Sequence, residues 1–282
     1  MVTHSYAHVN SIRLHYAAQG TGSLVLFLHG FPEFWYEWRN LLPEFGKDHL
    51  VVAPDMRGYN LSDKPTEVEQ YQMHHLVGDV RALAEYLGYQ RFTLVGHDWG
   101  GMVAWYFAMT HPTWLDKLII INAPHEAIFR RELTHNPAQQ QASAYAQMFR
   151  DPRAEAILSA RNYARLTQML FGSNLFGSEA EKKEYITAWS RPGALTGGLN
   201  YYRAMTGQDP ANASHPASAM VNVPTLVIWG EKDTALLAGN LDGLTLYVPN
   251  LSIKRIPDGT HWVIHEQPLT VIALMREFLE TS

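Results

Sequence analysis

Short apolar runs alternate with amphipathic segments along much of the chain. Two alternating segments within residues 3–18, joined at Asn10 and Ser11, predict a β-hairpin. Further strands are predicted by apolar runs of the buried-strand type, at residues 24–28, 50–53, 91–95, 118–121, 223–229 and 251–256. Because helical patterns separate several of these strands, we expect a mostly parallel sheet with helices on both of its faces.

Three segments carry apolar residues that recur every three or four positions, as on one face of a helix. They span residues 76–87, 102–109 and 271–279. Gly88 follows the first and Pro112 lies shortly after the second, as expected at helix C-termini. The strands and helices together predict an α/β fold.

The alternation of strands and helices stops after Asn122. Residues 125–216 are helical in pattern, rich in aromatic residues and without a convincing strand. A segment of this length is too long for a loop in a compact domain. We therefore expect a core in two parts, residues 1–124 and 217–282, with a helical cap inserted between them.

Composition restricts the class of protein. The chain is 46% apolar and 17% charged, which is ordinary for a globular protein. Its net charge of −5 gives no surplus of cations for phosphates, so we expect no nucleic-acid partner. The absence of cysteine excludes disulfides, thiol nucleophiles and iron–sulfur clusters. No apolar stretch matches a signal peptide or a membrane span, so we expect a cytoplasmic protein. The oligomeric state stays open between a monomer and a homodimer.

Residues 96–100 read Gly-His-Asp-Trp-Gly and lie between a predicted strand and a predicted helix. This is the pattern of a nucleophile elbow, with Asp98 where many hydrolases have serine. Such a turn lifts the central side chain above the carboxyl edge of the sheet, where open α/β sheets bind ligands. Taken alone, the motif is also compatible with a glycine-rich turn that carries a solvated aspartate.

The turn after the first parallel strand reads His-Gly-Phe-Pro over residues 29–32. We expect a backbone N–H of this turn to face the same pocket as Asp98. Together with the N–H of Trp99 it would form an oxyanion hole with two donors.

Asp233 and His261 each lie in a loop that follows a late strand, within Gly-Glu-Lys-Asp (230–233) and Gly-Thr-His-Trp (259–262). The order nucleophile, acid and histidine is that of α/β-hydrolases. Asn122 follows the fourth parallel strand, but an amide cannot supply the charge of the acid. This favours Asp233 as the partner of His261.

Five segments together resemble the α/β-hydrolase-fold epoxide hydrolases, and the resemblance covers essentially the whole chain. They are HGFPEFWYEWR (29–39), RGYNLSDKP (57–65), GHDWGGMVAW (96–105), WGEKD (229–233) and GTHW (259–262). The resemblance implies the α/β-hydrolase fold, with a mostly parallel central sheet and an inserted helical cap. Asn60 stands where such sequences often have glycine, and asparagine tolerates positive φ well.

The same resemblance implies further site residues. In the cap, the segment SRPGALTGGLNYYRAM (190–205) is similar to the one that carries an epoxide-binding tyrosine, and Tyr202 is a better candidate than Tyr201. Tyr145 matches the second such tyrosine. Phe31 and Trp99 match the positions whose backbone N–H groups form the oxyanion hole.

Trp35, Tyr36 and Trp38 are aromatic residues close to this turn. We expect Trp35 to line the substrate pocket, although aromatic clusters after a sheet turn more often serve packing. His97, next to the predicted nucleophile, is expected to be structural rather than catalytic.

These residues imply a reaction in two steps. An aspartate carboxylate suits displacement at a saturated carbon, so Asp98 would open an epoxide and form an ester that water then hydrolyses to a vicinal diol. The two tyrosines would stabilise the opening oxygen, and His261, held by Asp233, would activate the water. The substrates are an epoxide and water, and neither a metal nor an organic cofactor is needed.

Two alternatives remain at this point. A haloalkane or haloacid dehalogenase shares the aspartate, the histidine and Trp99. Haloalkane dehalogenases commonly have asparagine in place of Phe31, and fluoroacetate-type relatives have arginines where residues 99–102 read Trp-Gly-Gly-Met. A silent ligand-binding member of the fold would show a broken triad position, and the sequence shows none.

Overall fold

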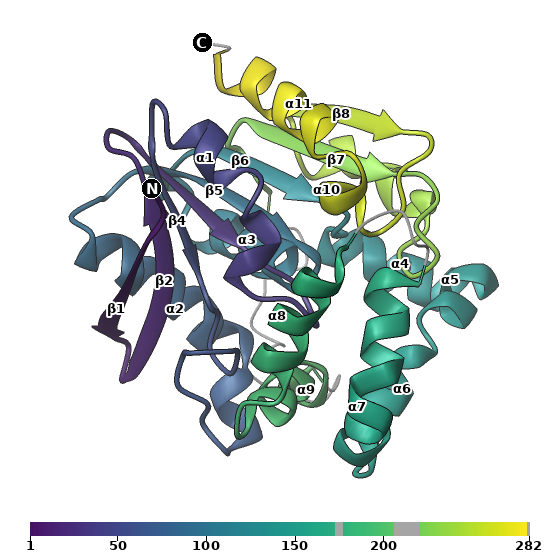
Figure 1. The fold of residues 1–282 in the computed structure, drawn as a ribbon. Coiled ribbons are helices and arrows are strands. Elements are labelled where there is room, and N and C mark those ends of the chain that lie inside the picture. Colours follow the sequence, from purple (N-terminus) through teal and green to yellow (C-terminus); the bar gives the residue numbers. More distant parts are fainter. Residues whose placement is uncertain (173–176, 206–219, 281–282) are drawn as a thin grey trace.

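An eight-stranded sheet organises the computed structural model, which describes residues 1–172, 177–205 and 220–280 (Figure 1). The strands are β1 Thr3–Val9, β2 Ile12–Gln19, β3 Leu24–Leu28, β4 Leu50–Pro54, β5 Phe92–His97, β6 Leu115–Ile121, β7 Thr225–Gly230 and β8 Leu251–Ile256. Their order across the sheet is β1-β2-β4-β3-β5-β6-β7-β8. β1, β2 and β4 pair antiparallel, and every pair from β4 to β8 is parallel. The predicted mostly parallel sheet is confirmed.

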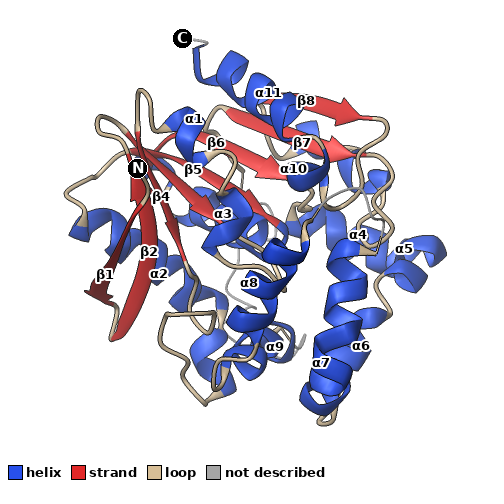
Figure 2. Cartoon of the chain, in the orientation of Figure 1, coloured by secondary structure: helices blue, strands red, loops and turns tan. Residues whose placement is uncertain are grey.

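Helices cover both faces of this sheet (Figure 2). They are α1 Leu42–Phe45, α2 Met73–Tyr86, α3 Asp98–Thr110, α4 Glu126–His135, α5 Pro137–Ala142, α6 Tyr145–Arg150, α7 Ala154–Phe171, α8 Glu179–Trp189, α9 Ala194–Ala204, α10 Val263–Glu266 and α11 Pro268–Glu280. The sequence did not predict α1 or α10, because four residues are too few to show helical periodicity. The three helices that it did predict correspond to α2, α3 and α11.

Alternation along the strands divides the core into two layers. In β3, Leu24, Leu26 and Leu28 join the apolar cluster that includes residues of α2 and α3, whereas Val25 and Phe27 join the cluster that includes residues of α1 and α11. Successive strand side chains point to opposite faces, so a wholly apolar strand is buried on both sides.

Two turns with positive φ show how the sequence sets the fold locally. Asn10 and Ser11, with φ of 46° and 64°, join β1 to β2 and confirm the predicted hairpin. Asn60 has a φ of 37°, and its amide donates to Asp55 Oδ2 at 2.9 Å. Asparagine therefore takes the conformation for which glycine is usual, and it gains a buried hydrogen bond there.

Helices α4 to α9 are inserted between β6 and β7, and we call them the cap. They lie together below and to the right of the sheet in Figure 1, in teal and green. The predicted boundary of the cap at residues 216 and 217 lies outside the described residues. Within the described ranges, no helix combines the length and the apolarity that crossing a membrane requires.

The order of the strands determines where a site can form. The chain passes from β3 to β4 on one side and then returns to β5 on the other side of β3. In open α/β sheets ligands bind at the carboxyl ends of the strands where the order reverses. Phe31 follows β3 and Asp98 follows β5, so both lie at this point.

Candidate active site

The predicted nucleophile lies in a sharp turn between β5 and α3. Asp98 is the first residue of α3 and has a φ of 48°, a left-handed conformation that is uncommon outside glycine. A Cβ added at Gly96 would overlap the backbone of Gly100, and one added at Gly100 would overlap the carbonyl oxygen of Leu28. The turn therefore needs these glycines, as the elbow motif predicted.

A backbone N–H from the neighbouring loop binds the Asp98 carboxylate. Phe31 N–H donates to Asp98 Oδ1 at 2.8 Å. A Cβ at Gly30 would lie 2.7 Å from the same oxygen, so only glycine allows this close approach. Trp99 lies in the first turn of α3, where backbone N–H groups have no acceptor within the helix. The predicted donor in the loop is found, and Trp99 stays the predicted second donor.

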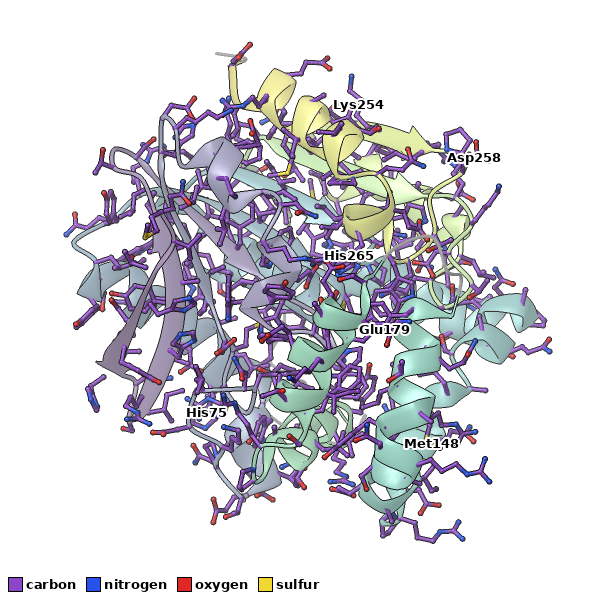
Figure 3. All side chains as sticks on the ribbon, in the orientation of Figure 1. His75, Met148, Glu179, Lys254, Asp258 and His265 are labelled. Carbon is purple, nitrogen blue, oxygen red and sulfur yellow. The ribbon has the colours of Figure 1, made fainter. Side chains whose placement is uncertain are left out.

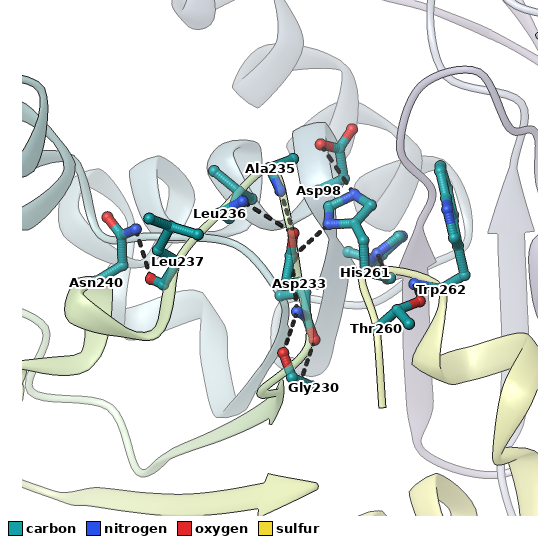
Figure 4. A network of polar contacts seen from close by, with 12 residues as sticks. Asp98, Gly230, Asp233, Ala235, Leu236, Leu237, Asn240, Thr260, His261 and Trp262 are labelled. Carbon is teal, nitrogen blue, oxygen red and sulfur yellow. Dashed lines mark hydrogen bonds and ion pairs between the residues drawn. The ribbon is translucent and has the colours of Figure 1, made fainter. Parts of the chain in front are cut away.

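His261 lies between two carboxylates that come from distant parts of the chain (Figure 4). Its Nδ1 is 2.7 Å from Asp233 Oδ2, and its Nε2 is 3.6 Å from Asp98 Oδ2. The side chain is largely buried, with 9% of the residue exposed. The structure thus brings together the nucleophile, acid and histidine that the sequence predicted.

Hydrogen bonds hold the Asp233 carboxylate in a fixed orientation. Oδ1 accepts from the backbone N–H groups of Ala235 and Leu236, at 2.8 and 2.9 Å. Oδ2 accepts from Asn122 Nδ2 at 2.8 Å, and Asn122 Oδ1 accepts from Gly230 N–H at 2.9 Å. The sequence excluded Asn122 as the acid, but it gave no sign that Asn122 orients the acid.

The charges of the three groups depend on one another. Burial by itself would raise the pKa of Asp98. The hydrogen bond and charge of the neighbouring His261 have a larger opposite effect, so the pKa of Asp98 is lowered. Burial would likewise lower the pKa of His261, but Asp233 and then Asp98 raise it well above 6.5. Asp98 is therefore ionised in the resting site, as a carboxylate nucleophile must be.

A cavity of about 650 Å³ opens above Asp98 between the sheet and the cap. Asp98, Trp99, Tyr145 and Tyr202 all line it. The rings of Tyr145 and Tyr202 lie 6.3 Å apart, and Trp99 packs edge-on against Tyr202 at 5.0 Å. Tyr201 instead donates from its hydroxyl to the carbonyl of Arg57 at 2.9 Å and is fully buried. The cavity thus receives Tyr202 and not Tyr201.

Both cavity tyrosines are hydrogen-bond donors over a wide pH range. Burial, followed by the negative charge of Asp98, raises the pKa of Tyr202 well above 10. The same two causes raise the pKa of Tyr145. Their hydroxyls therefore keep their protons near a carboxylate that is ionised.

Trp35 does not line this cavity, which corrects the prediction for this residue. Its ring packs edge-on against His4 of β1 at 4.8 Å, and its backbone N–H donates to Asp55 Oδ1 at 3.1 Å. The short 3₁₀ helix Trp35–Trp38 places the Trp38 ring 5.0 Å from Phe27. Both rings belong to the apolar cluster on the face of the sheet that α1 and α11 cover. Trp35 and Trp38 therefore serve packing, as aromatic clusters after a sheet turn more often do.

A buried polar network behind the nucleophile was not predicted. His97 Nε2 lies 2.9 Å from the carbonyl oxygen of His261, and its Nδ1 lies 2.8 Å from Glu37 Oε1. Glu37 Oε2 in turn accepts from Gly30 N–H at 3.0 Å. These residues lie in three separate segments, so no local sequence pattern connects them. His97 acts as a support for the histidine loop, in agreement with its predicted structural role.

Glu33, Glu37 and His97 are the one group in the described residues with enough ligand atoms close together for a metal ion, within 4.8 Å of one another. Burial, and then the charge of Glu33, raise the pKa of Glu37 well above its ordinary value.

Comparisons with known proteins agree with this geometry. The family model of the alpha/beta hydrolase fold matches residues 23–268. Epoxide hydrolase 4 of Mus musculus is 36% identical, over 99% of this chain and 80% of its own length. The AB hydrolase superfamily protein YfhM of Bacillus subtilis (strain 168) is 38% identical, over 98% of both chains. A variant of the Bacillus megaterium epoxide hydrolase, solved with its product (R)-3-[1]naphthyloxy-propane-1,2-diol, superimposes with a TM-score of 0.93 at 36% identity, over 98% of this chain and 100% of its own.

Proposed function

The chain belongs to the epoxide hydrolases of the α/β-hydrolase fold, and we propose that its conversion of epoxides to vicinal diols proceeds through an ester on Asp98. One observation carries this proposal. The Asp98 carboxylate lines the cavity together with two tyrosines, accepts a hydrogen bond from the Phe31 N–H and lies 3.6 Å from His261 Nε2. Each group needed for the two steps is therefore within the same site.

In the first step, Asp98 attacks a carbon of the epoxide ring. The new C–O bond forms as the ring C–O bond breaks, and the ring oxygen takes up the negative charge. The Tyr145 and Tyr202 hydroxyls stabilise this charge, and one of them transfers its proton to the oxygen. The product of this step is a hydroxyalkyl ester of Asp98 with one tyrosinate.

In the second step, His261 removes a proton from water, and the oxygen attacks the ester carbon of Asp98. Negative charge develops on Oδ1, where the Phe31 N–H already donates a hydrogen bond. The ester C–O bond then breaks, and the diol leaves with the proton that His261 took from water. The second proton of the water, which is left on the Asp98 carboxyl group, passes to the tyrosinate. The sum is epoxide plus water giving diol.

Esterification also prepares His261 for its role as the base. Two carboxylates raise the pKa of His261 in the resting enzyme, and one of them is Asp98. The ester has no charge, so the pKa of His261 falls when the intermediate forms. A proton held on the imidazole is therefore released to solvent when the ester forms and is taken back when Asp98 is regenerated, so the imidazole is free to act as a base in the hydrolysis step.

The surroundings of Phe31 argue against halide release as the main reaction. The Phe31 ring packs against Phe149 at 5.0 Å and Tyr202 at 5.5 Å, so an apolar ring occupies the position at which haloalkane dehalogenases commonly have an amide. A departing halide needs donors at that position, whereas an epoxide oxygen is served by the tyrosines.

The cavity supports epoxides with a bulky aromatic substituent as substrates. It has a volume of about 650 Å³ and aromatic and apolar residues line much of it, including Met102, Phe129 and Leu236. The product bound by the Bacillus megaterium relative also carries a naphthyl group. We expect faster diol formation from naphthyl glycidyl ether than from short aliphatic epoxides, measured by the ratio kcat/KM.

Mass spectrometry of His261→Gln tests the ester directly. This variant is expected to form the intermediate and fail to hydrolyse it, so the peptide that contains Asp98 gains the entire mass of the epoxide. A haloalkane would instead add its mass less one hydrogen halide. A folded variant that acquires no adduct from a broad panel of epoxides would disprove covalent catalysis by Asp98.

The cytoplasmic location and the monomeric or dimeric state stay predictions from the sequence. Light scattering of the purified protein distinguishes the two oligomeric states. The division into core and cap likewise stays a prediction, for which the position of α4 to α9 between β6 and β7 is the structural support.

A further inference from the structure

Three residues of the cap helix α8 bind the chain segment that follows β3. Glu181, Tyr185 and Trp189 are spaced four residues apart, so their side chains share one face of the helix. The segment that they contact, residues 32–39, begins directly after Phe31. The cap is therefore attached to the core beside the backbone N–H that binds Asp98.

The two contacts nearest Phe31 are made by buried aromatic side chains. Trp189 Nε1–H donates to the carbonyl of Pro32 at 2.5 Å. The Tyr185 hydroxyl donates to Glu33 Oε1 at 2.8 Å, and both side chains of this pair are fully buried. Glu33 N–H also donates to the carbonyl of Gly30 at 3.0 Å, which closes the turn around Phe31. The conformation of residues 30–33, which we call the oxyanion loop, thus depends on the cap as well as on the core.

The third contact fixes the N-terminal end of α8. Arg39 Nε donates to Glu181 Oε1 at 2.8 Å, while Glu181 Oε2 caps the helix by accepting from Ser178 N–H at 2.7 Å. Arg39 Nη1 also donates to His265 Nδ1 at 3.2 Å. Figure 3 labels His265 of α10 and Glu179, the first residue of α8. Helix α8 is therefore bound to the core along its whole length.

We infer that Tyr185 and Trp189 are positioning residues that hold the Phe31 N–H in place for hydrolysis of the ester. Neither side chain lines the described cavity, so neither contacts the substrate there. They act through residues 32 and 33 on the orientation of the neighbouring N–H. This inference rests on the proposed function, because it assigns the Phe31 N–H to the charge that develops on the ester oxygen.

The two steps of the reaction depend on this N–H to different extents. In ring opening, the charge on the Asp98 carboxylate decreases, and the tyrosines stabilise the developing charge. In ester hydrolysis, a full negative charge forms on the oxygen to which Phe31 N–H donates. A displaced oxyanion loop should therefore slow the second step far more than the first.

The test uses Tyr185→Phe, Trp189→Phe and the double variant of the full chain. Excess enzyme is mixed rapidly with naphthyl glycidyl ether, stopped with acid at a series of times, and analysed by intact mass. We expect ester loss to slow about tenfold in the double variant, less than the roughly 100-fold cost of a 1 Å misplacement. Ester formation should stay within about twofold of the wild type, so the ester accumulates.

Tyr163→Phe is the matched control. The Tyr163 ring also packs against Trp189, at 6.0 Å, but within the described residues it makes no hydrogen bond to residues 32–39. Both rate constants should stay at the wild-type value in this variant. Thermal melts of all variants establish that they are folded.

The outcomes separate this inference from the function on which it rests. Selective slowing of ester loss supports it. Equal slowing of both steps, or unchanged ester loss in the folded double variant, overturns it and leaves the ester mechanism intact. Absence of any ester in His261→Gln overturns the proposed function, and this inference with it.

Discussion

Asp98 combines three properties that the chemistry requires. Its left-handed φ of 48° directs the carboxylate away from the sheet edge, its pKa is lowered by His261, and one of its oxygens already accepts from Phe31 N–H. A non-glycine residue in this conformation stores about 1–2 kcal/mol of strain. The surrounding glycines and the triad maintain this strained position, as expected if Asp98 is the nucleophile that we propose.

The stability of the protein should depend on pH through His261. Burial opposes protonation of this residue, but Asp233 and Asp98 raise its folded pKa well above 6.5. The protonated histidine therefore contributes its full stabilisation below pH 6.5 and loses it as the pH rises through the folded pKa. We expect the difference in free energy of unfolding between the wild type and His261→Gln to shrink as urea titrations move from pH 6 to pH 10. A constant difference over this range would contradict the raised pKa.

Removal of either cavity hydroxyl should slow ring opening. Tyr145→Phe and Tyr202→Phe each remove one of two donors to the developing alkoxide, so each single variant should retain partial activity. Loss of a comparable oxyanion donor costs about 10²–10³ in rate, and the double variant should be nearly inactive. Tyr201→Phe, which alters a buried hydroxyl bound to Arg57, is the matched control and should form ester at the normal rate. Normal single-turnover ester formation in the double variant would refute the assignment.

The elements around the nucleophile are packed too closely for any side chain at the glycines of the turn. A Cβ at Gly100 would overlap a backbone carbonyl, which cannot move without shifting β3. Gly100→Ala should therefore lower the free energy of unfolding by about 3 kcal/mol or more, at the upper end of the usual cost of overpacking. Gly88→Ala is the control, because its φ is 85° but the added Cβ would meet open space. It should cost only about 1–2 kcal/mol in urea titrations. Equal losses in the two variants would contradict close packing as the reason for glycine at position 100.

Elements whose signal is local were predictable from the sequence, and contacts between distant segments were not. The hairpin at Asn10 and Ser11, the apolar strands and the elbow at Asp98 each follow from neighbouring residues. The resemblance to a family supplied Tyr202, which no periodicity identifies. Trp35 was misplaced because the direction of a short 3₁₀ helix depends on the packing beneath the sheet. The bonds of α8 to residues 32–39 join segments about 150 residues apart, as in Trp189 to Pro32, separated by 157 positions.

The cap and the core share one apolar cluster, so the whole molecule should unfold as a unit. Phe149, Leu166 and Leu199 of the cap belong to the same buried cluster as Leu26 and Val103 of the core. Neither part can expose its face of this cluster without destabilising the other. We expect coincident urea transitions by far-UV circular dichroism and by hydrogen exchange of cap amides. An earlier transition for the cap amides would show that the cap unfolds independently.

The hydrogen bond from Phe31 N–H makes the two oxygens of Asp98 distinguishable by isotope. If Oδ1 stays on this donor throughout the reaction, the diol always carries away the other oxygen, and the oxygen from water takes the vacated position. One turnover in H₂¹⁸O should then give unlabelled diol and an enzyme with one heavy oxygen. Transfer to ordinary water should release that heavy oxygen completely in the next diol formed. A carboxylate that rotates between turnovers would release only about half of it, so the isotopic content of the second diol measures how firmly a single amide holds the nucleophile.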